Sequence, residues 1–210
     1  MEGSGPVPAG TDSLRTAVAL LRNGGLVIVP TETFYGIACD ALDPGAVGRL
    51  ALLKARERGK PIPLIAGSVG AIREAVSELP PLFQSLAGAF WPGPLTLVLA
   101  ARSIFPGEIT AGTSTIGVRI PGESFALELA RAFGGLITAT SANVAGQPPP
   151  RSPGEIDLET ARGVDLVVDG GVTPGGLPST VLDLTLAPPA IVRPGPLDEQ
   201  VAKFLLSGLR

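Results

Sequence analysis

The sequence contains no histidine, and this absence excludes more chemistry than any other feature of its composition. Without imidazole there is no Ser–His or Cys–His catalytic pair and no histidine ligand for a metal ion. Cysteine is almost as scarce: Cys39 is the only one, so an internal disulfide is excluded. Whatever reaction the protein supports must depend on other groups, in a compartment that we expect to be the reducing cytoplasm.

Long hydrophobic runs are also lacking. No apolar stretch reaches the roughly 18 residues that a membrane-spanning helix needs, and the start of the chain lacks the charged and apolar regions of a signal peptide. Asp plus Glu outnumber Lys plus Arg by 19 to 16, which gives a net charge of −3. We therefore expect no membrane contact and no globally basic surface for nucleic acid, although a local basic patch remains open.

Glycine and proline are abundant instead, with 28 and 22 among the 210 residues, so we expect many short elements joined by tight turns. Helix patterns at 11–25 and 124–135 alternate with short apolar runs at 26–29 and 136–140. This alternation predicts an α/β fold (α+β in some schemes), with a twisted, mixed β-sheet flanked by helices in three layers. Residues 1–10 are predicted to be a flexible N-terminus and residues 11–210 a single domain.

A cluster of basic residues ends one predicted helix. Asp43 is a good N-cap and Pro44 a good first residue, and the helix is predicted to continue to about Arg56. Cations at its end either complement the helix dipole or hold a polyphosphate or a carboxylate. Since the motifs G-x-x-x-x-G-K-[ST] and G-x-G-x-x-G are absent, side chains would have to hold any nucleotide. The cluster, in KARERGK, consists of Lys54, Arg56, Arg58 and Lys60.

Four segments rich in hydroxyl groups lie where predicted strands meet loops: PTET (30–33), TAGTST (110–115), TSAN (140–143) and PST (178–180). Each alone is explained by turns in which Ser, Thr and Asn bond their own backbone. Because ligands gather at strand ends in open α/β sheets, the four are also candidates to converge on one pocket. Among charged residues, Glu32 is either a general base or the tip of a turn. Arg119 and Arg193 interrupt apolar strands and face either solvent or a ligand.

These segments occur in an order typical of one protein family. PTETFYG (30–36), KAR (54–56), VRIP (118–121), TSAN (140–143), PSTVLD (178–183) and VRPG (192–195) follow one another as in the YrdC/Sua5 family, which the chain resembles over roughly residues 13–195. Six motifs in order are a specific signal. Only a short helical pattern follows VRPG, so the resemblance is to the short, single-domain form of the family. One departure is Glu57, where the family usually has proline.

The resemblance implies a function. Members of the family form threonylcarbamoyl-AMP and pyrophosphate from L-threonine, bicarbonate or CO2, and ATP; this nucleotidyltransferase activity supplies the t6A modification at position 37 of tRNA. The implied fold is YrdC/RibB-like with a concave, positive cavity. Mg2+ would be held mainly by the ATP phosphates rather than by protein ligands, and a downstream threonylcarbamoyl transferase complex would be a partner.

The family's site residues carry over to positions of this sequence. The residues that would contact threonine are Thr31, Tyr35, Arg119 and Ser179. Those that would surround ATP are Lys54, Arg56, Lys60, Thr115, Ser141, Asn143 and Arg193. Four of these are expected to be catalytic: Lys54, Arg56, Ser141 and Asn143.

Two other functions remain open at this point. A module that binds double-stranded RNA or tRNA without catalysis would use the same concave surface, but the acidic excess and the 4% aromatic content count against it. The carbamoyl-transfer domain of hydrogenase maturation shares the fold, but normally lies in a longer chain with zinc fingers, and no C-x-x-C occurs here. The missing histidine and the basic cluster favour catalysis by positioning and charge neutralisation, without a covalent enzyme intermediate.

Overall fold

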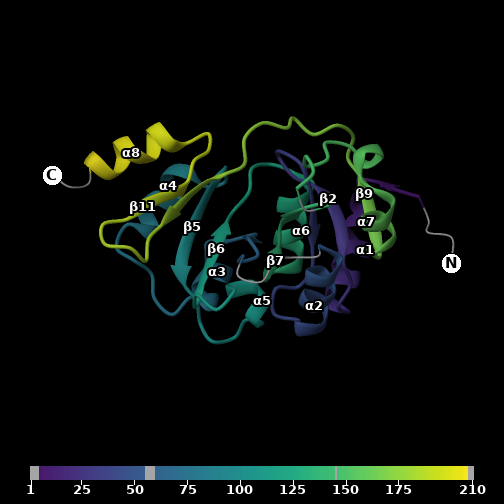
Figure 1. Ribbon diagram of the computed structural model, residues 1–210, viewed down its shortest axis with the longest axis horizontal. Coiled ribbons are helices and arrows are strands. Elements are labelled where there is room, and N and C mark those ends of the chain that lie inside the picture. Colours follow the sequence, from purple (N-terminus) through teal and green to yellow (C-terminus); the bar gives the residue numbers. More distant parts are fainter. Residues whose placement is uncertain (1–4, 55–59, 145, 208–210) are drawn as a thin grey trace.

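The computed structural model describes residues 5–54, 60–144 and 146–207. Its strands form two mixed sheets that lie side by side (Figure 1). The first sheet has the order β1-β9-β2-β3-β8, with parallel pairs at β1–β9 and β9–β2 and antiparallel pairs elsewhere. Its strands are β1 (Val7–Pro8), β9 (Leu166–Asp169), β2 (Val27–Pro30), β3 (Tyr35–Ala38) and β8 (Thr140–Ser141).

The second sheet has six strands in the order β11-β10-β5-β6-β4-β7. Two of its pairs are parallel, β10–β5 and β4–β6, and the other three are antiparallel. Its strands are β11 (Ala190–Arg193), β10 (Thr180–Asp183), β5 (Leu95–Ala100), β6 (Thr115–Arg119), β4 (Leu64–Ala66) and β7 (Leu136–Thr138).

The two sheets are joined where one segment passes from one to the other. β7 belongs to the second sheet, and β8, which begins two residues later, belongs to the first. At the junction Asp40 pairs with Ile137, and the Thr138 amide donates to the carbonyl of Cys39 at 3.0 Å. The predicted fold class, mixed α/β with flanking helices, is thus confirmed, with the strands divided between two connected sheets.

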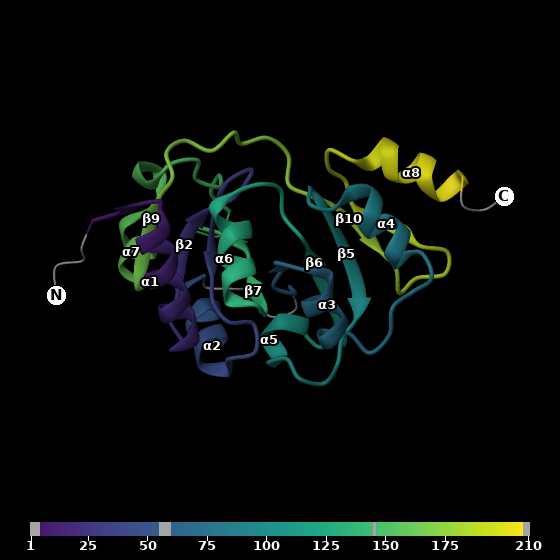
Figure 2. The same cartoon turned by 180° about the vertical axis from the view of Figure 1, so that it is seen from behind.

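Helices cover the sheets on one side in a row, α1, α6, α3 and α4 (Figure 2). In β2 the side chains alternate between two cores: Val27 and Val29 pack in the cluster that contains α1 and α6, and Ile28 packs in the one that contains α2. The helices are α1 (Thr11–Arg22), α2 (Pro44–Leu53), α3 (Val69–Ala75), α4 (Phe83–Phe90), α5 (Gly107–Thr110), α6 (Phe125–Phe133), α7 (Leu158–Arg162) and α8 (Asp198–Ser207), with a 3-10 turn at Pro153–Glu155.

The start of α2 agrees with the sequence prediction, and its end does not. The carboxylate of Asp43 accepts hydrogen bonds from the amides of Gly45 and Ala46, and Pro44 is the first helical residue. The helix ends at Leu53 rather than near Arg56, with Lys54 as its C-cap. The prediction for Arg56 and Arg58 falls on residues 55–59, outside the described residues.

Strand β3 was missed by the sequence analysis. PTET was expected to lead into a loop, but the chain turns back at residues 31–34 and pairs antiparallel with β2, Val29 opposite Gly36. The segment YGIA does not alternate between apolar and polar residues, because the strand is covered on both faces and all four of its residues are buried. Val7 and Pro8 pair with β9, and the division at residue 10 stays a prediction. Within the described ranges, no helix has the length and apolarity to cross a membrane.

Candidate active site

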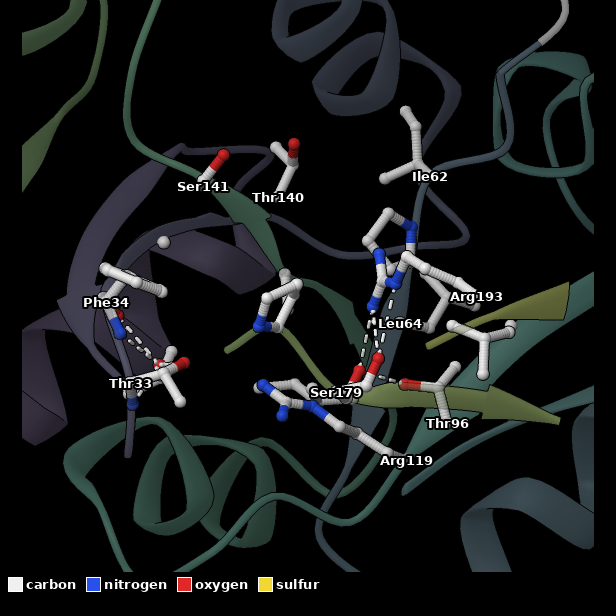
Figure 3. A pocket seen from close by; sticks show the side chains of 18 of the residues that line it. Thr33, Phe34, Ile62, Leu64, Thr96, Arg119, Thr140, Ser141, Ser179 and Arg193 are labelled. Carbon is white, nitrogen blue, oxygen red and sulfur yellow. Dashed lines mark hydrogen bonds between the residues drawn. The ribbon is translucent and has the colours of Figure 1, made fainter. Parts of the chain in front are cut away.

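A cavity of about 690 Å³ lies against the exposed face of the second sheet and is bordered by strand ends of the first (Figure 3). Each of the four hydroxyl-rich segments contributes to its lining, and the structure thus brings together side chains far apart in the sequence. The hydroxyl-bearing residues that line it are Thr31, Thr33, Tyr35, Thr96, Thr115, Thr140, Ser141 and Ser179.

Alternation along β6 places its functional side chains on the cavity face. Ile116 and Val118 are fully buried in the core, whereas Thr115, Gly117 and Arg119 line the cavity. On the core side of this sheet, β5 packs its leucines against α3 and α4. A two-residue period requires this division, because successive side chains of a strand point to opposite faces.

Ser179 is the centre of a hydrogen-bonded group at the cavity edge. The Arg193 guanidinium donates to the Ser179 carbonyl at 2.8 and 3.2 Å and to its hydroxyl at 3.0 Å. The Ser179 hydroxyl also lies 2.7 Å from the hydroxyl of Thr96. Ser179 and Thr96 are buried, and their polar groups are satisfied by one another and by Arg193. Figure 3 shows Arg119 and Arg193 on either side of this group.

Arg119 forms an ion pair with Glu32, which is not one of the lining residues. Its NH1 donates to the Glu32 Oε1 at 2.5 Å, and the two side chains are only 11% and 16% exposed. Burial lowers the pKa of the Arg119 guanidinium, and the adjacent carboxylate partly opposes this shift. Desolvation, and then the positive charge of Arg119, lowers the pKa of Arg193. The two cations therefore act on one another within this part of the cavity.

Lys54 holds the TSAN segment at another edge of the cavity. Its ammonium donates to the Ser141 carbonyl at 2.7 Å, to the Asn143 carbonyl, and to the Asn143 Oδ1 at 3.1 Å. The Ser141 hydroxyl donates to the same Oδ1 at 2.5 Å, and the Asn143 amide nitrogen donates to the Gln147 carbonyl. Figure 3 shows Ser141 across the hollow from Ser179.

The hydroxyls of the PTET turn serve the turn itself. The Thr31 hydroxyl donates to the Phe34 carbonyl at 2.7 Å and accepts from the amides of Thr33 and Phe34. Tyr35, fully buried, donates its hydroxyl to the Gly171 carbonyl at 2.7 Å and accepts from the Gly170 amide. Burial raises the pKa of the Tyr35 phenol. The turn is thereby a rigid wall of the cavity.

Most of the residues that the family resemblance assigns to the site border this one cavity. Seven of them line the cavity: Thr31, Tyr35, Thr115, Arg119, Ser141, Ser179 and Arg193. Lys54 and Asn143 are not among the lining residues but are bonded to one another and to Ser141, which is, and Lys60 is exposed next to Pro61, a lining residue. Arg56 lies outside the described residues.

Sequence reasoning missed Thr96 and the partner of Glu32. Thr96 and Val98 line the cavity between the buried Leu95, Leu97 and Leu99, so the alternation of LTLVL carried the signal. The alternatives left open for Glu32 did not include an ion pair, because nothing in the sequence places it beside Arg119. Ile62 and Leu64, which form part of the apolar lining, were not named from the sequence either.

A metal site built by the protein is not found in the described part of the chain. There, no three His, Cys, Asp or Glu side chains gather in a way that would hold a metal ion. The cavity lining carries hydroxyls and guanidinium groups, which are poor ligands for Mg2+ compared with carboxylates.

Comparison with known proteins agrees with the arrangement of these segments. The family pattern Sua5_yciO_yrdC, described as "Telomere recombination", matches residues 19–195. A curated relative from Pyrococcus abyssi, named "Threonylcarbamoyl-AMP synthase", is 40% identical over 89% of this chain and 55% of its own length. A relative from Mycobacterium tuberculosis, named "Putative threonylcarbamoyl-AMP synthase", is 36% identical over 90% of this chain and 88% of its own length.

A solved structure shows the same fold. The crystal structure of P. abyssi Sua5 "complexed with L-threonine" superposes with a TM-score of 0.86, at 38% identity, over 93% of this chain and 58% of that one. The chain thus spans little more than half the length of the Pyrococcus protein and most of the length of the mycobacterial one.

Proposed function

Because the chain belongs to the Sua5_yciO_yrdC family, we propose that it condenses L-threonine, bicarbonate and ATP into L-threonylcarbamoyl-AMP, with release of pyrophosphate and water. The observation that carries the proposal is the single cavity into which PTET, β6, TSAN and PST all project. Two relatives are named for this activity, one of them as putative, and the P. abyssi Sua5 structure is described as complexed with L-threonine. The product would supply a threonylcarbamoyl transferase complex that forms t6A in tRNA.

The chemistry suits a chain without histidine. The amine of threonine adds to CO2, supplied by bicarbonate, and loses a proton to give a carbamate. A carbamate oxygen then attacks the α-phosphorus of ATP, the bond to the β-phosphate oxygen breaks, and pyrophosphate leaves. Such a transfer needs positioning and charge neutralisation rather than a protein nucleophile. A stable acyl- or phospho-enzyme during turnover would contradict this mechanism.

The threonine end of the cavity is proposed to be the Arg119 side. Arg119 would pair with the carboxylate of the amino acid, because four of the five N–H groups of a guanidinium are left after the bond to Glu32. Ser179, Thr31 and Tyr35 would border the amino acid. An apolar contact with its methyl group would favour threonine over serine by about 1–3 kcal/mol.

The ATP side is proposed to be bounded by the basic cluster and TSAN. Lys54, Arg56 and Lys60 would neutralise phosphate charge, with Ser141 and Asn143 forming the adjoining edge. Thr115 and Arg193 are also assigned to ATP. Since the described residues hold no cluster of metal ligands, we propose that Mg2+ arrives with the ATP phosphates and is held mainly by them.

The test is formation of the product itself. The chain would be incubated with ATP, labelled bicarbonate and each amino acid in turn, and labelled carbamoyl-adenylate would be sought by chromatography. We expect product with threonine and at least tenfold less with serine. Arg119→Ala should lose most product and Arg22→Ala, at an exposed position on α1, should lose none. Absence of adenylate with threonine would overturn the proposal.

A further inference from the structure

Glu32 is linked to the cavity by its ion pair with Arg119. Glu32 is not one of the described residues that line the 690 Å³ cavity, but its ion-pair partner Arg119 is. Glu32 borders instead a second hollow of about 520 Å³, together with Glu123 and Ser124. The Glu32 carboxylate therefore does not contact a ligand of the cavity directly. It affects the charge and the orientation of Arg119, which lines the cavity.

The charges at this edge add up to a single positive unit. Arg119 and Arg193 contribute two cations, and Glu32 contributes one anion at 2.5 Å from Arg119. Desolvation and then the charge of Arg119 lower the pKa of Arg193, and Figure 3 places the two side chains on either side of Ser179. Without Glu32, two like charges in a poorly solvated site would favour a dianion such as a phosphate group. With Glu32, the charge of Arg119 is offset by its own partner, so this edge attracts a dianion less strongly, whereas Arg193, which is assigned to the ATP side, has no such partner among the described residues.

The geometry of the pair leaves the guanidinium available. Only the Glu32 Oε1 is bonded to Arg119, and the buried Oε2 has no hydrogen-bond partner within the described residues. The Cγ of Glu32 lies close to Gly122, where an added Cβ would approach it to 3.3 Å. The carboxylate is thus confined between β6 and the turn that follows β2, and it holds one N–H of Arg119 while the remainder of the fork faces the cavity.

We propose that Glu32 is a positioning residue that determines anion selectivity: it reduces the charge at the Arg119 edge so that this edge takes the carboxylate of an amino acid and disfavours a phosphate dianion. The inference rests on the proposed function for the identity of that amino acid. It explains how one cavity rich in cations keeps the amino acid and the triphosphate in separate places. An ATP phosphate at Arg119 would otherwise block the amino-acid site.

The experiment compares Glu32→Gln with the unaltered chain and with Glu123→Gln. Glu123 borders the same second hollow, but its side chain is 79% exposed and is 3.8 Å from Arg131, so its variant removes the same charge away from Arg119. Sulfate serves as the dianion, because its charge does not change near neutral pH. The measurements are KM for threonine and for ATP, kcat, and the inhibition constant of sulfate against each substrate.

We expect Glu32→Gln to raise KM for threonine about tenfold when ATP is present, because ATP phosphates then compete for Arg119 and the guanidinium loses the bond that orients it. The value of kcat should change by less than about threefold, since the loss affects ground-state binding of one substrate. The inhibition constant of sulfate against threonine should fall about tenfold, and that against ATP should not change. Glu123→Gln should leave every value unchanged, and Glu32→Asp, which restores the charge, should recover most of the selectivity. Unchanged sulfate inhibition in Glu32→Gln, or an equal loss of affinity for both substrates, would overturn the inference.

A second arm needs no turnover and separates this inference from the proposed function. Sulfate should raise the melting temperature of Glu32→Gln more than that of the unaltered chain, and Arg119→Ala in the Glu32→Gln background should abolish the extra stabilisation. If this arm succeeds and no adenylate forms with threonine, the proposed function fails and the charge control by Glu32 holds. If the variant does not fold, sulfate inhibition of the unaltered chain tests the inference. Sulfate should then compete with ATP. If sulfate competes with threonine at a concentration equal to or lower than the one at which it competes with ATP, the inference is overturned.

Discussion

The ammonium of Lys54 lies 2.7 Å from the carbonyl oxygen of Ser141, although 87 residues separate the two in the sequence. The same ammonium also donates to the carbonyl and side-chain oxygens of Asn143. Among the described residues, three acceptors of the TSAN segment surround this ammonium. Lys54 therefore shapes the TSAN edge of the cavity before any nucleotide is present.

Lys54→Met should damage both stability and activity. The substitution keeps the apolar stem and removes the charged donor, leaving the carbonyls of Ser141 and Asn143 without it. We expect the free energy of unfolding to fall by about 2 kcal/mol, as for loss of charged hydrogen bonds. Turnover should fall on the order of a hundredfold if positioning of this edge is required. Urea denaturation and pyrophosphate release measure the two effects.

The matched control is Lys203→Met, at an exposed position on α8, which should change neither stability nor turnover. Near-normal turnover in Lys54→Met would contradict the role assigned to Lys54.

Thr96→Val should weaken threonine binding with little change in fold. The two side chains are nearly isosteric, but valine cannot bond the Ser179 hydroxyl, which lies 2.7 Å from the Thr96 hydroxyl. We expect about 1 kcal/mol of lost stability and a several-fold rise in KM for threonine, because Ser179 loses one of its restraints. Steady-state kinetics with threonine as the varied substrate test this, beside Thr185→Val, an exposed control. A Thr96→Val enzyme with the original KM would show that the hydroxyl pair does not position Ser179.

The buried thiol of Cys39 predicts a loss of stability in alkali. Burial raises its pKa from 9.0 to about 11, and the hydrogen bond with Thr138 only partly offsets this. Below pH 9 the thiol is protonated in both states, so the folded protein has its full stability. Between pH 9 and 11 the unfolded chain releases the proton and the folded one retains it, so stability should decline by about 2 kcal/mol.

Denaturation curves at several pH values would measure this decline. Cys39→Ala should be less stable at neutral pH because of the lost packing, but its stability should change less between pH 9 and 11. The native thiol should also react slowly with iodoacetamide at pH 8. An identical alkaline slope in Cys39→Ala would show that other groups cause the loss.

Gly195→Ala should disturb the cavity from behind. An added Cβ would lie 2.3 Å from the Thr180 amide nitrogen and 2.6 Å from the Pro178 carbonyl oxygen, both of which are backbone atoms next to Ser179. We expect a loss of about 1–3 kcal/mol through overpacking, and a rise in KM for threonine as Ser179 shifts. Gly48→Ala is the control: it lies inside α2 with nothing within 4 Å of its added Cβ, and should stabilise the protein by up to about 1 kcal/mol. Thermal unfolding and kinetics together distinguish the two glycines.

Much of the fold followed from local patterns. The apolar spacing of α1 and α6, the Asp43–Pro44 start of α2 and most strands of the second sheet were predicted, because these depend on periodicity and capping within a few residues. The short elements β1, β3, β8, α5 and α7 were not. Their sequences show neither a helical nor an alternating period and no uninterrupted β-branched run, and their pairing depends on partners distant in the sequence.

The amino-acid sequence alone determined three things about this protein. It excluded histidine chemistry, indicated the mixed α/β class and identified the family to which the motifs belong, since each of these depends on composition or on short ordered segments. Only the tertiary structure decided that Glu32 faces Arg119 and that Lys54 holds Ser141. Each of these pairs spans 87 residues, so the register of separate strands and turns determines them and no local pattern does. The sequence shows which residue types are present, but the arrangement of the two sheets side by side determines which of them become partners.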